Sequence, residues 1–246
     1  MRLGVIPAAG SGTRLGPFTN AIPKELLPVG DKAVIEHVVE AMRLSGISDI
    51  VIVCRPHKHG LSDYLGSGKR FGVNLTYVIQ DECRGLADAV LSAEHVIDES
   101  FAVVLGDNFF HPKSFLGELI SSHVEKGADA TLGVGEVEDV SRHGIIAPKG
   151  DSIVDIVEKP SPEEAFSKLG SIGMYVFSPE IFDAIRKTEP GYKGELQLTD
   201  SVKVMINWGK KVFYKKIEGI HIDVGTPKDL MRANDWYMKR SWQEQR

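Results

Sequence analysis

The sequence predicts an α/β fold in which helices cover both faces of a mostly parallel sheet. Two observations predict it: apolar strand-like runs alternate with helical patterns through the first half of the chain, and short strand-like runs with little helix between them follow Asp129. Alternating strands and helices form parallel sheets. The second observation indicates a small β region inserted on the same sheet. We expect one three-layer domain over residues 1–240, with its parts about 1–128 and 129–225, and a tail over 241–246.

Apolar periodicity predicts the elements of the first half in order. Val34, Val38, Ala41 and Met42 share one helical face, and Gly46 follows as a stop signal. The expected strands are 3–8, 50–54, 75–79 with a half-buried alternation, and 101–105; the expected helices are 33–45, 86–96 and 115–124.

After Asp129 we expect mainly short strands. They lie at 130–137, 144–148, 153–158, 171–177, 212–217 and 220–224, with helices near 196–207 and from 227 to about 239. Alternation in the third strand places Asp155 and Val157 on the opposite face from Ile156.

Composition excludes several classes of protein. The apolar fraction of 42% and the charged fraction of 26% are typical of an ordinary globular protein. A net charge of −5 gives no support for binding to nucleic acid or to a membrane surface, and no apolar run approaches the ~20 residues that span a bilayer. Residues 1–9 are interpreted as a buried strand, not a leader. Cys54 and Cys83 make neither a disulfide framework nor a metal cluster, so we expect a cytoplasmic protein.

A glycine-rich turn, Gly10-Ser11-Gly12-Thr13-Arg14, follows the first apolar run. Glycines let backbone N–H groups approach anionic oxygens, so this loop is suited to phosphate. Leu15 stands where a dinucleotide fingerprint needs glycine or alanine, which argues against a redox Rossmann enzyme. The P-loop pattern is absent as well. Lys24 follows ten residues after Arg14, and two cations beside such a loop suit a triphosphate.

Two aspartates end separate apolar runs. Asp107 follows Val103-Val104-Leu105-Gly106, and Asp223 stands in Ile222-Asp223-Val224-Gly225-Thr226. Carboxyl ends of strands are where open α/β sheets bind ligands. Magnesium takes one or two carboxylates together with substrate phosphates. Either aspartate alone could be a helix cap or a turn residue.

Five separated motifs occur in an order that resembles the sugar-1-phosphate nucleotidylyltransferases, nearest to the glucose-1-phosphate thymidylyltransferases, with the uridylyltransferases as neighbours. The motifs are the glycine loop with Lys24, Gly106-Asp107-Asn108, Glu158-Lys159-Pro160, Gly194-Glu195-Leu196-Gln197-Leu198-Thr199-Asp200, and Asp223-Val224-Gly225-Thr226. The resemblance implies a Rossmann-like, GT-A-like nucleotidyltransferase fold. It also implies that residues 1–128 bind nucleotide, that 129–225 bind sugar, and that the chain forms a homo-oligomer.

The resemblance also implies a role for each matching residue. The catalytic set is Arg14, Lys24, Asp107 and Lys159; the nucleotide-binding set is Ala8, Ala9, Gly10, Ser11, Gly12, Thr13, Gln80, Gly85 and Asp107; the sugar-phosphate set is Asn108, Gly144, Glu158, Lys159, Gly173 and Lys193; and Asp107 and Asp223 hold Mg²⁺. Lys193 stands where relatives often have arginine. The lysine ammonium is a point charge and lacks the two parallel donors of a guanidinium. Ile172 stands where thymidylyl enzymes often have threonine.

The expected reaction is magnesium-dependent transfer from dTTP to glucose-1-phosphate, which yields dTDP-glucose and pyrophosphate. Gln80 offers a donor and an acceptor that match the O4 and N3–H edge shared by thymine and uracil, although a flipped amide could meet cytosine. It could also be a polar residue that ends an edge strand. The alternatives are a UTP-dependent enzyme and a catalytically silent nucleotide-sugar-binding homologue. We expect no metal role for His57 and His59. His143 could approach the sugar, but as a loop histidine it is expected to be solvated.

Overall fold

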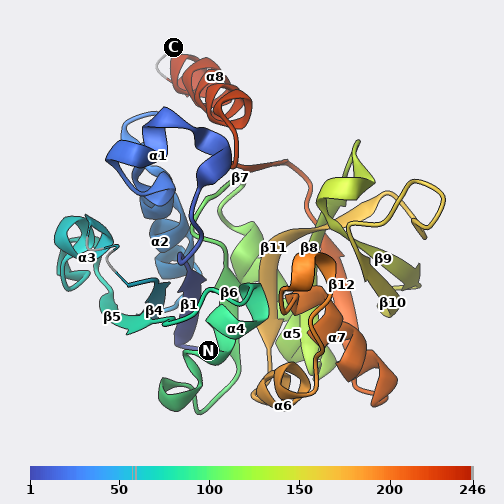
Figure 1. Cartoon of the computed structure of the whole chain (residues 1–246). Helices are drawn as coiled ribbons and strands as arrows, with labels where there is room; N and C mark the ends of the chain where they lie inside the picture. Colours follow the sequence, from blue (N-terminus) through green and yellow to red (C-terminus); the bar gives the residue numbers. More distant parts are fainter. Residues whose placement is uncertain (57, 59, 245–246) are drawn as a thin grey trace.

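The computed structural model describes residues 1–56, 58 and 60–244, with side chains described through residue 240. Within these residues the chain forms one nine-stranded sheet (Figure 1). Its order is β5 (Asn74–Ile79), β4 (Asp49–Cys54), β1 (Leu3–Pro7), β6 (Phe101–Val104), β11 (Leu169–Phe177), β8 (Ala130–Glu136), β12 (Val212–Lys216), β10 (Ser152–Glu158) and β9 (Gly144–Lys149).

Strand direction confirms a mixed, mostly parallel sheet. β5, β4, β1 and β6 pair in parallel, as do β8 and β12. β11 is antiparallel to β6 and β8, and β10 is antiparallel to β12 and β9. Five of the strands that follow Asp129, β8 to β12, therefore extend the same sheet as expected, whereas the strand expected at 220–224 lies in a separate small sheet.

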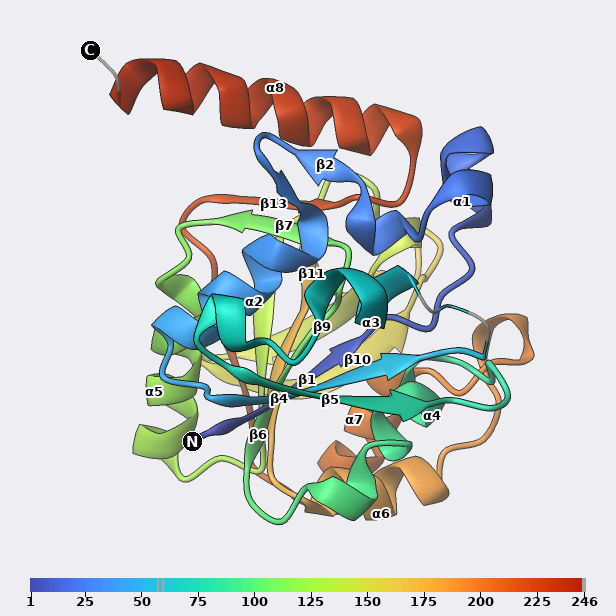
Figure 2. The ribbon, with the colours of Figure 1, turned by 90° about the vertical axis from the view of Figure 1, so that its left-hand side faces the viewer.

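Helices cover both faces of the sheet and make three layers (Figure 2). One face carries α2 (Val34–Leu44), α3 (Gly60–Leu65) and α5 (Phe115–Lys126), and the other carries α4 (Leu86–Leu91), α6 (Glu180–Arg186) and α7 (Leu198–Asn207). Each face buries its own apolar core, with Ile6, Ile50 and Ile52 on the α2 side and Val5, Val51 and Val53 on the α4 side. This alternation along β1 and β4 follows from the two-residue period of a strand.

Two small sheets of two strands each stand apart from the large one. β2 (Pro28–Val29) pairs with β3 (Lys32–Ala33), and β7 (Asn108–His111) pairs antiparallel with β13 (Ile220–Asp223). The long helix α8 (Pro227–Glu244) packs over β2 and β13 (Figures 1 and 2). Val29, Phe109, Ile222 and Ala233 form a third core beneath it. None of the described helices is both long and apolar enough to cross a membrane.

The structure differs from the predicted elements in several places. β7 and α6 were not predicted, α4 ends at Leu91, and α8 continues to Glu244, into the segment expected to be a tail. Val124, the last residue of the helix expected at 115–124, is 64% exposed because α5 turns it away from the sheet at its last turn. In β10 the pairing register shifts between Ile153 and Asp155, so Ile153 and Ile156 are both buried although they are three residues apart.

Candidate active site

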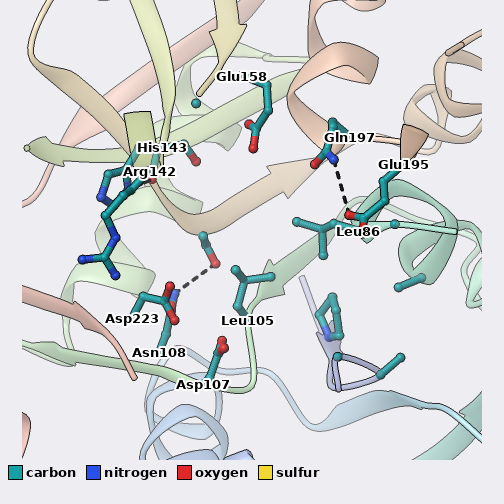
Figure 3. Close-up of a pocket in the computed structure, with 18 of the residues that line it drawn as sticks. Leu86, Leu105, Asp107, Asn108, Arg142, His143, Glu158, Glu195, Gln197 and Asp223 are labelled. Atoms are coloured by element: carbon teal, nitrogen blue, oxygen red, sulfur yellow. Dashed lines mark hydrogen bonds between the residues drawn. The ribbon is translucent and has the colours of Figure 1, made fainter. Parts of the chain in front are cut away.

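A cleft of about 660 Å³ opens between the two halves of the sheet, on the side where β1 and β6 end. Figure 3 shows Asp107, Asn108 and Asp223 on one side of it and Glu158, Glu195 and Gln197 on the other. Its lining includes nearly all of the predicted site residues: Ala9, Gly10, Ser11, Arg14, Lys24, Gln80, Gly85, Asp107, Asn108, Gly144, Glu158, Lys159, Gly173, Lys193 and Asp223. The cleft therefore brings both halves of the predicted site together. Gly12 and Thr13 in the glycine loop, and Ala8 just before it, are not part of this lining.

A buried ion pair holds the start of the glycine loop from inside the protein. The ammonium of Lys58 donates to the carbonyl oxygens of Ala8 and Gly10, at 2.7 and 3.0 Å, and lies 2.8 Å from Oε2 of Glu25. The side chains of Lys58 and Glu25 are 6% and 1% exposed. Sequence reasoning missed both residues, although Glu25 follows Lys24 directly. The neighbouring His57 and His59 lie outside the described residues.

The pairing of β7 with β13 brings the two predicted metal-binding aspartates together. Asp223 lies opposite Asn108 in this ladder, and the N–H of Val224 donates to the carbonyl oxygen of Asp107 at 3.0 Å. Lys24 hydrogen-bonds to Oδ2 of Asp107. Burial opposes ionisation of Asp107, but the Lys24 ammonium lowers its pKa below the ordinary value. Burial and the neighbouring Asp107 carboxylate raise the pKa of Asp223 to about 7.

The oxygen donors of this aspartate pair fit a magnesium ion. Oδ1 of Asp223 is buried, and no group in the described part of the chain hydrogen-bonds to it. A buried acceptor without a partner is costly unless a ligand satisfies it. The described residues contain no cluster of three or more His, Cys, Asp or Glu side chains arranged for a metal. Two carboxylates that leave the other positions to water and phosphate oxygens are the arrangement magnesium prefers.

The other side of the cleft carries the predicted sugar-phosphate residues. Gly144 pairs with Glu158 across β9 and β10, and Oε2 of Glu158 accepts a hydrogen bond from Thr199 at 2.8 Å. Lys159 follows at φ 46° and donates to Oε1 of Glu158 at 2.6 Å. Adjacent carboxylate and ammonium groups can bind hydroxyl and phosphate groups of one ligand.

Tyr192 was missed by sequence reasoning. The ammonium groups of Lys159 and Lys193 lie 4.9 and 5.5 Å from its ring centroid, so the ring holds two cations at the cleft. Lys193 has φ 59°, a left-handed conformation that is strained for lysine.

A bulge in β11 holds Asn108 in the cleft. The pairing of β11 with β8 is irregular between Ser171 and Tyr175, and Gly173 has φ 69°. The carbonyl oxygens of Ile172 and Gly173 consequently accept hydrogen bonds from Nδ2 of Asn108, at 2.7 and 3.2 Å. The side chain of Ile172 itself is buried in the core.

Gln80 and Gly85 lie together at the start of α4. Gly85 has φ 123°, and a Cβ on it would overlap the backbone of Leu196, so this position requires glycine. Nε2 of Gln80 donates to Asp88 and to the carbonyl oxygen of Gly85. Backbone hydrogen bonds from Leu196 to Arg84 and from Ala87 to Leu196 tie this segment to the Glu195–Thr199 motif.

His143 departs from the expected solvated loop residue. It lines the cleft, half-buried, and a ring nitrogen lies 3.4 Å from the carbonyl oxygen of Ser171. Burial lowers its pKa. Arg142 and His221 also line the cleft and were missed, because no recognisable motif marks them. Gln197 lines it too; it lies in the Gly194–Asp200 motif, but no role was predicted for it.

These features define a class of protein: an α/β protein whose cleft combines a glycine loop, paired carboxylates and fixed cations, suited to a polyphosphate. The chain matches the Nucleotidyl transferase family over residues 3–240. It is 36% identical to UTP–glucose-1-phosphate uridylyltransferase 2 of Streptococcus pyogenes, covering 97% of this chain and 91% of that protein. It is also 36% identical to the low-salt glycan biosynthesis nucleotidyltransferase of Haloferax volcanii, but spans only 64% of its length.

Solved structures agree with this match. A UDP-glucose pyrophosphorylase complexed with UDP-glucose has a TM-score of 0.91 at 32% identity, covering 98% of this chain and 99% of that one. A Bacillus anthracis protein assigned as glucose-1-phosphate thymidylyltransferase, in complex with sucrose, has a TM-score of 0.87 at 32% identity, with 96% and 95% covered. The chain belongs to the nucleotidyl transferase family and is a nucleotidyltransferase.

Proposed function

We propose that this protein transfers a uridylyl group from UTP to glucose-1-phosphate, giving UDP-glucose and pyrophosphate. The observation that carries the proposal is the joining, in one cleft, of the glycine loop and aspartate pair with Glu158 and Lys159 from the opposite half of the sheet. One side of the cleft carries groups suited to bind a nucleotide, and the other carries groups suited to bind a sugar phosphate. Such a site can hold two anionic substrates next to each other.

The reaction needs no nucleophile from the protein. A phosphate oxygen of glucose-1-phosphate attacks the α-phosphorus of the nucleotide, a new P–O bond forms, and the bond to the β-phosphate oxygen breaks with its electron pair leaving on pyrophosphate. The attacking oxygen is already anionic, so the protein mainly positions both substrates and offsets their repulsion. Lys159 and Lys193 would hold the attacking phosphate, and Arg14 and Lys24 the departing pyrophosphate.

Asp107 and Asp223 would hold the magnesium ion, which neutralises charge at the α-phosphate when bound. Gly10 and Ser11 line the cleft beside Arg14 and would supply backbone donors to the triphosphate.

The choice of UTP rests on the relatives that cover nearly the whole of both chains. A second candidate is dTTP, because the structural neighbour assigned as a thymidylyltransferase covers 96% of this chain. Uracil and thymine share the edge that Gln80 can bind and differ by one methyl group, which is worth only ~1–3 kcal/mol in a fitted pocket.

Pyrophosphate release decides between these functions. Glucose-1-phosphate and Mg²⁺ are incubated with UTP, dTTP, CTP, ATP or GTP in separate reactions. Release with UTP well above dTTP supports the proposal, and the reverse order supports the second candidate. Binding of UTP without pyrophosphate release, over a panel of sugar phosphates, would instead indicate a silent nucleotide-binding homologue.

A further inference from the structure

The side-chain amide of Gln80 is held in one orientation by Asp88, which sequence reasoning did not assign, and by the backbone of Gly85. Gln80 is 3% exposed and lines the cleft. Its Nε2 donates to Oδ2 of Asp88 at 2.6 Å and to the carbonyl oxygen of Gly85 at 3.2 Å. Both amide protons therefore have acceptors, and Oε1 is the atom of this amide that remains for a ligand.

The opposite orientation is unfavourable. A flipped amide would place Oε1 against Oδ2 of Asp88 and the carbonyl oxygen of Gly85, which are both acceptors. An oxygen that faces two acceptors in a buried place loses its hydrogen bonds and meets repulsion. The hydrogen-bond partners thus decide which end of the Gln80 amide faces the cleft.

Asp88 is itself held by Arg84. Both Nε and Nη2 of Arg84 donate to Oδ1 of Asp88, at 3.2 and 2.8 Å, and the Asp88 side chain is 7% exposed. An ionised carboxylate accepts hydrogen bonds and donates none, so it can contact only the NH₂ end of a neighbouring amide.

We propose that Asp88 is a specificity-determining positioning residue. By fixing the Gln80 amide, it makes this point of the base subsite an acceptor, which complements the N3–H of uracil or thymine and opposes the unprotonated N3 of cytosine. This inference rests on the proposed function, because it presumes that a pyrimidine nucleotide occupies the cleft. Asp88 acts through Gln80 and does not touch the substrate.

The change Asp88→Asn tests the inference with little change of shape. Arg84 would still donate to the oxygen of the new asparagine amide. The NH₂ group of that amide would then point toward Gln80. Gln80 then rotates to accept that hydrogen bond, at the cost of its weaker hydrogen bond to the carbonyl oxygen of Gly85, and its own NH₂ faces the cleft. The ratio of kcat/KM for UTP to kcat/KM for CTP should fall by about tenfold, the value of one hydrogen bond of about 1.4 kcal/mol.

The matched control is Asp81→Asn, the same chemical change at an exposed residue in the loop before α4, which should leave the ratio unchanged. The double variant Arg84→Met with Asp88→Asn frees the asparagine to turn its oxygen back to Gln80, and the preference for UTP should return in part. A general loss of structure would lower both rates together and would not restore the ratio. An Asp88→Asn ratio equal to that of Asp81→Asn overturns the inference.

Two measurements on the unmodified protein cover the case in which Asp88→Asn does not fold. Calorimetry should show UDP binding more tightly than CDP, and equal affinities overturn the inference. NMR should place the Gln80 side-chain NH₂ protons, identified by their loss in Gln80→Ala, downfield and slow to exchange; a solvent-like pair overturns it too. If wild-type protein releases pyrophosphate from none of the nucleotides yet prefers UDP to CDP, the proposed function fails while the role of Asp88 stands.

Discussion

Lys24 forms an ion pair with Asp107, one of the two carboxylates proposed to hold magnesium. The two side chains are only 16% and 9% exposed, and the pair buries one ammonium against one carboxylate. Burial disfavours the charge on Lys24, but Asp107, Glu25 and Asp223 together raise its pKa. In the absence of nucleotide, Lys24 therefore occupies the carboxylate that the metal needs.

This competition predicts that Lys24→Met binds divalent cations more tightly than the wild type when no nucleotide is present. Removal of the ammonium frees Asp107, so the affinity for Mn²⁺, used as a probe for Mg²⁺, should rise by about tenfold, while turnover falls. Electron paramagnetic resonance of free Mn²⁺ measures the affinity without turnover. Lys32→Met, which removes a more exposed lysine paired with Glu40, is the control. Equal Mn²⁺ affinity in Lys24→Met and the control would contradict the competition.

Replacement of either aspartate of the proposed magnesium site should lower activity, and at Asp223 it should do so without loss of stability. Asp107→Asn and Asp223→Asn should each lower kcat by about 100-fold or more, since a catalytic metal contributes several kcal/mol to the transition state. Asp223→Asn should melt no lower than the wild type, because a neutral amide removes the repulsion of two adjacent buried carboxylates. Pyrophosphate release and thermal melting measure the two effects.

The control for the aspartates is Asp235→Asn on the exposed side of α8, which should change neither quantity. Normal turnover and normal metal dependence in Asp107→Asn would contradict the assignment of this carboxylate.

Gly144→Ala should weaken binding of the sugar phosphate. A Cβ at this position would overlap Cγ2 of Thr199 and lie 3.1 Å from Oε2 of Glu158, so it would disturb the hydrogen bond between those side chains. We expect KM for glucose-1-phosphate to rise by about tenfold, the loss of one charge-assisted hydrogen bond, with a smaller change in KM for UTP. Equal changes in both KM values would contradict a local effect at Glu158.

Gly117→Ala is the companion change and a prediction of its own. Gly117 is the third residue of α5, and a Cβ there would come no closer than 3.6 Å to Ser45 Oγ, which is ordinary contact. Alanine should stabilise the protein by about 0.5–1 kcal/mol and leave both KM values unchanged. Denaturant unfolding measures the gain, and destabilisation would contradict the packing described around α5.

Stability should fall as the pH decreases below about 6.5. Burial lowers the pKa of His37 and of His123 in the folded protein below the ordinary value of 6.5. Below pH 6.5 the unfolded chain therefore binds protons that the folded chain does not. The free energy of unfolding falls by at most about 1.4 kcal/mol per histidine for each pH unit. Urea unfolding from pH 7.5 to 5 measures the slope. His123→Gln should flatten it, and a slope equal to that of the wild type would exclude His123 as a contributor.

Most of the fold could be predicted because strand and helix periodicities are local. The strands β1, β4 and β6 and the helices α2 and α5 follow from apolar spacing alone. The missed elements have weak local signals: β7 is a four-residue strand that depends on β13, 109 residues away in the chain, and the bulge in β10 changes the period on which the prediction relied.

The residues of the candidate site also fall into a group with local sequence signals and a group without them. Glycine loops, strand-end aspartates and the Glu158-Lys159 pair are visible as motifs, because their chemistry resides in adjacent residues. Lys58, Tyr192 and Asp88 have no such signature. Their roles come from contacts across the fold. Lys58 pairs with Glu25 and Tyr192 packs against Lys159, which are distant in sequence, and the start of α4 turns Asp88 toward Gln80.

The sequence by itself determined which chemical groups are available and the order in which the strands that carry them occur. Only the tertiary structure decided which groups meet: the register of β7 with β13 sets Asp107 beside Asp223, and Asp88 selects the end of the Gln80 amide that faces the cleft. The physical reason is that hydrogen-bond partners and burial depend on distances across the fold, and those distances are set by packing between segments that local periodicity does not relate.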